Sequence, residues 1–297
     1  MKDFFTYLTV SDEDKNWGLY LNVAGRSEIA PHCEYPSTEH PSGYYFAWNS
    51  GRVLQEYQLN FITSGKGILE NIHGRFHVKE GSLMLISKDS WHRYRPLKNT
   101  GWIENYIGFA GLQAEHYMDF IISNSSQPVI HCGIREDIIE IYYKIFDLAQ
   151  KEEPGYQQIA SGLVLQLIGN ILSFKKRMTF SGKQIEVIIQ KIRVNMRENV
   201  EEDLNLQELA STYNIGYSYF RKMFKQYTGV PPKQYLLDLK IMRSKELLLT
   251  TDMSIKEISN AIGFESAHYF SRYFKKKAGI SPSEFKHIRP NKTNIFH

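Results

Sequence analysis

The sequence predicts an α+β protein of two domains. The chain has 297 residues, which is enough for two domains that each have a core. Residues 3–109 are rich in aromatic and β-branched side chains broken by Gly and Asn, whereas the later part carries apolar residues at steps of three and four. We expect residues 1–176 to form the first domain, 177–183 a linker and 184–297 the second domain.

Several short segments of the first domain have the composition and boundaries of β-strands. Gly-containing turns are expected at residues 64–67 and at His73-Gly74. Short strands at close spacing predict an antiparallel sandwich or a small barrel. The expected strands are residues 55–63, 67–71, 75–78 and 83–87.

Two amphipathic helices are expected after the strands, at residues 134–151 and 156–175, with Pro154-Gly155 between them. Their apolar stripes are wide enough to pack on the strands. The stripe of residues 156–175 is also wide enough to form a dimer seam, and the sequence leaves both interpretations open.

The second domain contains an internal repeat, residues 206–235 and 255–285. Phe220 corresponds to Phe270, and Gly229 corresponds to Gly279. Each copy has a short helix, a turn with Asn or Gly, and a second helix, which are the parts of a helix-turn-helix unit. The second helices are expected at residues 217–227 and 266–277, and a long helix at 233–249 joins the copies.

The outer face of each second helix is polar and basic, as a reader of the DNA major groove requires. From residue 181 onward the chain has 19 Lys and Arg against 12 Asp and Glu, while the preceding residues have 17 against 20. A basic half indicates a polyanionic partner for that half. A solvated helix face is the alternative for a single unit, but two units in tandem favour double-stranded DNA. The candidate DNA-binding residues are Ser218, Arg221, Lys222, Lys225, Ala267, His268, Ser271, Arg272 and Lys275.

The second copy carries specific motifs: the Gly263-Phe264 pair and the runs 269–272, 274–276 and 281–283. In these motifs the chain resembles the AraC/XylS (arabinose-regulator) family of bacterial transcription factors. The resemblance implies two recognition helices that enter successive major-groove segments. Gly216 departs from the pattern, because the family usually has a Ser there as the helix N-cap, so the start of the first recognition helix is less well specified.

The first domain matches the same family at residues 57–61, 65–67, 81–86, 91–94 and 102–108. It resembles the cupin-like effector-binding barrel, which implies a small-molecule ligand, often a sugar. Aromatic rings stack on the apolar side of a sugar, and Arg, Glu and His bind its hydroxyls. Barrel core is the alternative for each aromatic residue. The implied pocket residues are Arg52, His92, Tyr94, Glu104 and Tyr106.

Enzyme chemistry is not favoured, since the chain lacks the phosphate-loop, dinucleotide-binding and nucleophile-elbow motifs. We therefore expect no cofactor and no catalytic residue. A metal-dependent cupin needs convergent His and carboxylate ligands, but Tyr94 stands where a second His would accompany His92. Cys33 and Cys132 are expected to be free thiols. With no signal peptide in the N-terminal sequence, the expected location is the cytoplasm.

The sequence thus predicts a ligand-responsive, sequence-specific transcription regulator, an activator rather than a repressor, whose effector is a sugar or sugar derivative. RNA polymerase and a second copy of the chain are the expected protein partners. One alternative is a constitutive DNA-binding regulator whose barrel only dimerises. A less favoured alternative is a metal-dependent cupin enzyme with a DNA-binding tail. We expect the second helix-turn-helix unit to read bases more stringently than the first.

Overall fold

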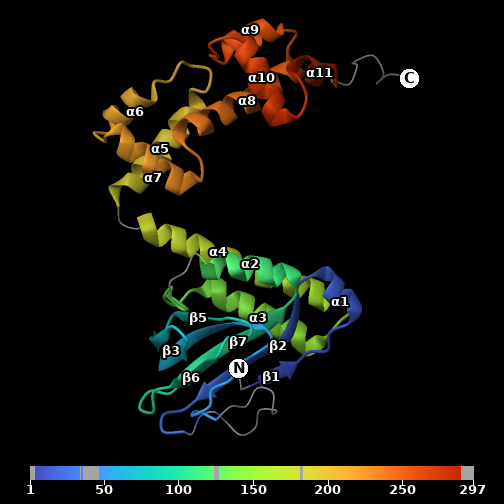
Figure 1. The fold of residues 1–297 in the computed structure, drawn as a ribbon, viewed down its shortest axis with the longest axis vertical. Helices are drawn as coiled ribbons and strands as arrows, with labels where there is room; N and C mark the ends of the chain where they lie inside the picture. The colour runs from blue at the N-terminus through green and yellow to red at the C-terminus, as the bar shows by residue number, and fades with distance from the viewer. Residues whose placement is uncertain (1–3, 34, 36–46, 124–126, 181–182, 289–297) are drawn as a thin grey trace. The chain divides into compact units, whose positions relative to one another are not determined.

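The computed structural model describes residues 4–33, 35, 47–123, 127–180 and 183–288 (Figure 1). The chain divides into two compact units, Met1–Lys175 and Lys176–His297. The first combines an antiparallel sheet with helices and the second is helical, which confirms the predicted α+β class. Among the described residues, no helix is both long and apolar enough to cross a membrane.

The sheet of the first unit runs in the order β1-β2-β7-β3-β5-β8, with β4 and β6 paired to the second half of β3. The first half of β3 pairs instead with β5 and β7. One long strand therefore takes part in two sets of pairings and curls the sheet towards a barrel. The strands are β1 (Phe4–Tyr7), β2 (Tyr20–Ile29), β3 (Tyr57–Asn71), β4 (Gly74–Lys79), β5 (Ser82–Ile86), β6 (His92–Pro96), β7 (Trp102–Ala110) and β8 (Val129–His131).

The turn predicted at residues 64–67 is wrong, because β3 continues through it. The register between β3 and β7 shifts between Ile62 and Ser64, and Gly65 has a φ of 89°. This irregularity bends the strand from one set of partners to the other without reversing it. The turn predicted at His73-Gly74 is confirmed, and β4 begins at Gly74.

Three helices of the first unit, α2, α3 and α4, lie on one side of the sheet (Figure 1). The larger core fills the space between them: Leu59 and Phe61 of β3 pack in one cluster with Ile145 of α3 and Leu167 of α4. The two predicted helices are thereby confirmed as elements that pack on the strands. The helices are α1 (Asp12–Trp17), α2 (Leu112–Ser123), α3 (Glu136–Lys151) and α4 (Tyr156–Phe180).

Helix α4 extends into the segment predicted as a linker. Lys176 and Arg177 are good helix formers and continue the helix as far as Phe180. Phe180 is buried in the core of the second unit. Residues 181–182 of the predicted linker lie outside the described part of the chain.

The second unit contains both predicted helix-turn-helix units, α6–α7 and α9–α10, joined by the long α8. The turns match the predicted backbone, with φ of 54° at Asn214 and 65° at Gly263. Phe220 and Phe270 are fully buried in two separate cores. The helices are α5 (Gln184–Glu198), α6 (Leu206–Thr212), α7 (Tyr217–Thr228), α8 (Pro232–Thr250), α9 (Ile255–Ala261), α10 (Ala267–Ala278) and α11 (Pro282–His287).

Gln157 connects the helix layer to the sheet. Its side chain on α4 accepts a hydrogen bond from the Leu21 backbone N–H at 2.9 Å and donates to the Leu21 carbonyl at 3.0 Å. Leu21 lies at the irregularity of β2, where the register with β7 shifts before Val23. The buried amide thus satisfies both backbone groups of Leu21 beside the irregularity.

Replacing Gln157 with Ala should lower the free energy of unfolding of the first unit by about 2–4 kcal/mol, because a buried N–H and a buried C=O both lose their partner. Gln158→Ala is the matched control, since its amide bonds Asp14 near the surface, and it should cost under about 1 kcal/mol. All four tryptophans lie in the first unit, so urea unfolding followed by tryptophan fluorescence reports this unit. Equal losses in the two variants would contradict the role given to Gln157.

Candidate functional site

A polar cluster occupies the face of the strands opposite the helix layer. Arg52 precedes β3, and its Nη2 donates to the Tyr94 hydroxyl at 2.8 Å while its Nε donates to His92 Nε2 at 3.2 Å. Asn60 of β3 donates to Glu104 Oε1 at 2.7 Å and to the Tyr94 hydroxyl at 3.2 Å. The structure therefore brings Arg52, His92, Tyr94 and Glu104 together around Asn60.

Tyr106 lies on the same face of β7, two residues beyond Glu104. Its hydroxyl is directed at Gly25 of β2, where a Cβ would collide with the ring. Within the described residues, no hydrogen bond joins Tyr106 to the other four predicted pocket residues. Tyr106 thus forms part of the wall beside the cluster.

The segment that carries Arg52 is fastened to β6. Arg52 and His92 exchange two backbone hydrogen bonds, at 2.9 and 3.0 Å. Trp91 Nε1 donates to the Ser50 carbonyl at 2.7 Å, and Arg93 Nη1 donates to the Trp48 carbonyl at 2.9 Å. These bonds hold the segment so that the Arg52 guanidinium reaches the cluster.

Burial shifts the Glu104 carboxyl and the His92 imidazole of the cluster towards their neutral forms. Desolvation raises the pKa of the Glu104 carboxyl to about 7, against the opposing hydrogen bond from Asn60. Desolvation and the nearby Arg52 charge lower the pKa of His92 to about 4. His92 is therefore neutral at pH 7, which lets its Nε2 accept from Arg52 while Nδ1–H donates to the Ser90 carbonyl at 3.0 Å.

Two buried polar atoms of this face have no hydrogen-bond partner in the described part of the chain, Asn60 Oδ1 and Trp102 Nε1. Asn60 is fully buried, and the Trp102 ring lies 6.0 Å from the Tyr94 ring. One atom is an acceptor and the other a donor. Since buried polar groups are normally paired, the cluster can accommodate a ligand that supplies one donor and one acceptor. Sequence reasoning missed both residues, although Asn60 stands out as a polar residue between the apolar Leu59 and Phe61 of β3.

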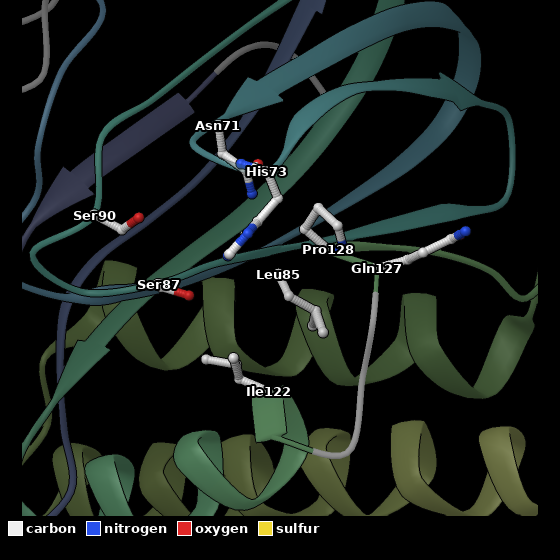
Figure 2. A pocket seen from close by; sticks show the side chains of 8 residues that line it. All are labelled: Asn71, His73, Leu85, Ser87, Ser90, Ile122, Gln127 and Pro128. Atoms are coloured by element: carbon white, nitrogen blue, oxygen red, sulfur yellow. The ribbon is translucent and has the colours of Figure 1, made fainter.

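A pocket of about 350 Å³ lies beside the cluster (Figure 2). None of the five predicted pocket residues lines it, but Asn71, which does, is paired with His92 in the β3–β6 register. Apolar Leu85 and Ile122 lie on one side of it and His73 on the other, as Figure 2 shows. The sequence did not predict this pocket. Its lining residues are Asn71, His73, Leu85, Ser87, Ser90, Ile122, Gln127 and Pro128.

The predicted DNA-binding residues lie on the outer faces of α7 and α10, opposite buried Phe220 and Phe270. Most of their side chains are solvent-exposed; only Ala267 and Ser271 are half-buried. The Arg272 guanidinium lies 5.9 Å from the centre of the Tyr269 ring. The exposed members are Ser218, Arg221, Lys222, Lys225, His268, Arg272 and Lys275.

The two recognition helices begin differently. The Ser266 hydroxyl caps α10 by accepting from the Tyr269 N–H at 3.2 Å. Helix α7 begins after Gly216 and has no side-chain cap. The first turn of α7 is therefore held less firmly than that of α10.

Comparison with known proteins identifies both units. Residues 34–168 match the AraC-like ligand binding domain, and residues 209–288 match a helix-turn-helix domain. The Msm operon regulatory protein of Streptococcus mutans is 26% identical over 258 residues, covering 85% of this chain and 90% of that protein. The Lactose operon transcription activator of Staphylococcus xylosus is 25% identical over 240 residues, covering 79% and 85%.

Among solved structures, the C-terminal domain of AraT, a response regulator from Geobacillus stearothermophilus, is 28% identical and covers 39% of this chain and 97% of its own, with a TM-score of 0.36. The two domain matches account for most of the chain, and the relatives align with both units. The chain belongs to the AraC family of transcription regulators, with a ligand-binding domain followed by a helix-turn-helix DNA-binding domain.

Proposed function

We propose that this protein is a transcription activator controlled by a neutral sugar or sugar derivative, bound among Arg52, His92, Tyr94, Glu104 and Tyr106. The observation that carries the proposal is the polar cluster with an unpaired acceptor and an unpaired donor among aromatic rings. Two relatives point to the same ligand class, the Lactose operon transcription activator and the Raffinose operon transcriptional regulatory protein RafR of Pediococcus pentosaceus, 22% identical over 247 residues.

A sugar has the chemistry that the cluster requires. Its hydroxyls donate to Asn60 Oδ1 and accept from Trp102 Nε1, which satisfies both unpaired atoms. Its apolar face packs on an aromatic ring such as Tyr94. The half-buried Arg52 supplies charge-assisted hydrogen bonds, and the buried Glu104 carboxyl supplies further hydrogen bonds that orient the ligand.

The proposed DNA contacts are made by α7 and α10, with Arg272 binding a guanine and Lys275 a phosphate. We further propose that two copies associate through α4, where Ile159 is 59% exposed, and engage neighbouring half-sites to recruit RNA polymerase in the cytoplasm. Effector binding controls this step only if the effector favours one arrangement of domains or protomers over another.

A panel of neutral mono- and oligosaccharides tests the proposal by thermal shift. The effector should raise the melting temperature of the wild type, since a ligand at one hundred times its Kd adds about 2.7 kcal/mol of stability. Arg52→Met should abolish the shift. Arg75→Met is the matched control and should keep the shift, because Arg75 of β4 pairs with Glu70 and not with the cluster. A panel without any shift favours the constitutive regulator. An equal shift in Arg52→Met would move the effector out of the cluster.

Glu104→Gln should change the pH dependence of stability. The folded-state pKa of Glu104, about 7, exceeds its usual 4.5, so the folded protein binds this proton more tightly than the unfolded chain. The resulting stabilisation is complete below pH 4.5 and is lost as the pH rises through 7. The melting temperature of Glu104→Gln should therefore gain on the wild type between pH 5 and pH 8. The exposed Glu80→Gln is the control, and the same pH trend in both variants would refute the buried carboxyl.

Arg272→Ala should cost about 1–3 kcal/mol of DNA-binding free energy at one base step and relax specificity there. Lys222→Ala should cost less discrimination, because α7 is uncapped and Lys lacks the bidentate geometry of Arg. Competition binding with each base of the site replaced in turn measures both. Uniform weakening on every sequence would assign Arg272 to phosphate, and a larger loss of discrimination in Lys222→Ala would reverse the ranking.

A further inference from the structure

Helix α8 is the element that the two helix-turn-helix units share. Leu236 is buried in the first core, while Ile241 and Leu248 are buried in the second. Among the described helices, α8 alone contributes buried side chains to both cores. The relative placement of the two recognition helices therefore depends on how each unit is fixed to α8.

Apolar packing between the two helix-turn-helix units is interrupted beside α8. A cavity of about 450 Å³ lies there. It is lined by Leu206 and Tyr217 of the first helix-turn-helix unit, Phe264 and Tyr269 of the second helix-turn-helix unit, and Lys240 of α8. Because a cavity supplies no packing contacts, the polar interactions around it add to the apolar packing of each core on α8.

Lys240 makes the first of these interactions. Its side chain is 4% exposed, and its Nζ donates to the Gly263 carbonyl at 2.9 Å, in the turn between α9 and α10. A Cβ built on Gly263 would lie 3.7 Å from the carbonyl oxygens of Glu201 and Glu202, so the α5–α6 loop meets α8 and the second turn at this point. Burial of the ammonium lowers the pKa of Lys240, against the opposing charge of Asp203.

Arg243 makes the second interaction, one helical turn further along α8. Its Nε donates to Glu201 Oε1 in the α5–α6 loop at 2.6 Å. Residues three apart on a helix share a face. One face of α8 is thus bonded to the α9–α10 turn through Lys240 and to the α5–α6 loop through Arg243.

Asp238 ties α8 directly to the second recognition helix. Its carboxylate accepts from the Tyr273 hydroxyl at 3.2 Å and pairs with Lys277 Nζ at 2.8 Å. Lys240 and Asp238 therefore hold both ends of the turn-to-helix segment against α8.

We propose that Lys240 is a positioning residue that fixes α10 relative to α7, and thereby determines the spacing of the two DNA boxes that the protein accepts. A buried ammonium adds little net stability, but its bond to one carbonyl restricts the angle at which the second helix-turn-helix unit meets α8. Each added base pair moves the second box by about 3.4 Å and turns it by roughly 35°, so a firmly held junction rejects altered spacings. The inference rests on the proposal that both α7 and α10 read DNA.

The test begins with full-length wild-type protein and a randomised DNA duplex library, which yields the two selected boxes and their spacing. Kd is then measured for the selected duplex and for duplexes with one base pair more or fewer between the boxes. In Lys240→Met the preference for the selected spacing should fall by roughly tenfold, the size expected for one hydrogen bond to a charged group. The base preferences within each box should stay as in the wild type.

Lys256→Met is the matched control, because Lys256 is exposed on α9, and its spacing preference should equal that of the wild type. Arg243→Gln removes the part-exposed ion pairs with Glu201 and Glu246 and leaves the buried Lys240 in place, so we expect it to keep the fold and to lower the spacing preference in the same direction. An unchanged preference in both junction variants, or equal weakening at every spacing, overturns the proposal. Selection of a single box by the wild type would instead overturn the reading of DNA by two helices, and this inference with it.

Discussion

The two-residue period of β3 and β7 is the constraint on which the first unit depends. Leu59 and Phe61 face the helix layer, while Asn60 and Glu104 face the opposite side and meet there. A slip of one residue would exchange the two sets and place polar groups under the helices. The irregularity after Ile62 follows these positions, so it bends the strand without disturbing the alternation that forms the cluster.

The same alternation joins the proposed effector site to the helices. Tyr142 of α3 donates to the Leu59 carbonyl at 2.9 Å, and Asn60, the next residue, bonds Glu104. Gln157 makes the equivalent connection from α4 to β2. If ligand binding at the proposed site shifts the strands, these bonds to backbone atoms are the contacts through which α3 and α4 would respond.

The second unit was predictable because its signals are local. The turns at Asn214 and Gly263 act within a few residues, and both have the predicted positive φ. The caps at Ser254 and Ser266 are equally local, but they were not predicted from the sequence. The first unit was less predictable from its sequence. Gly65 lies in a segment with the composition of a turn. Its positive φ instead bends β3, because the strand on either side of it pairs with the distant β6 and β7. Likewise, Trp48 is held beside the site by Arg95, which stacks on its ring at 3.9 Å, and by Arg93, which donates to its carbonyl. Both contacts join segments far apart in sequence.

The two recognition helices differ in how firmly they are held, and this bears on where control can act. Helix α10 has the Ser266 cap and the Asp238 and Lys240 attachments. Helix α7 begins at an uncapped glycine, Gly216. Reorienting α7 thus breaks fewer hydrogen bonds than reorienting α10. If an effector shifts the populations of two DNA-binding arrangements, we expect the change of lower cost to keep α10 fixed on α8 and to adjust the start of α7.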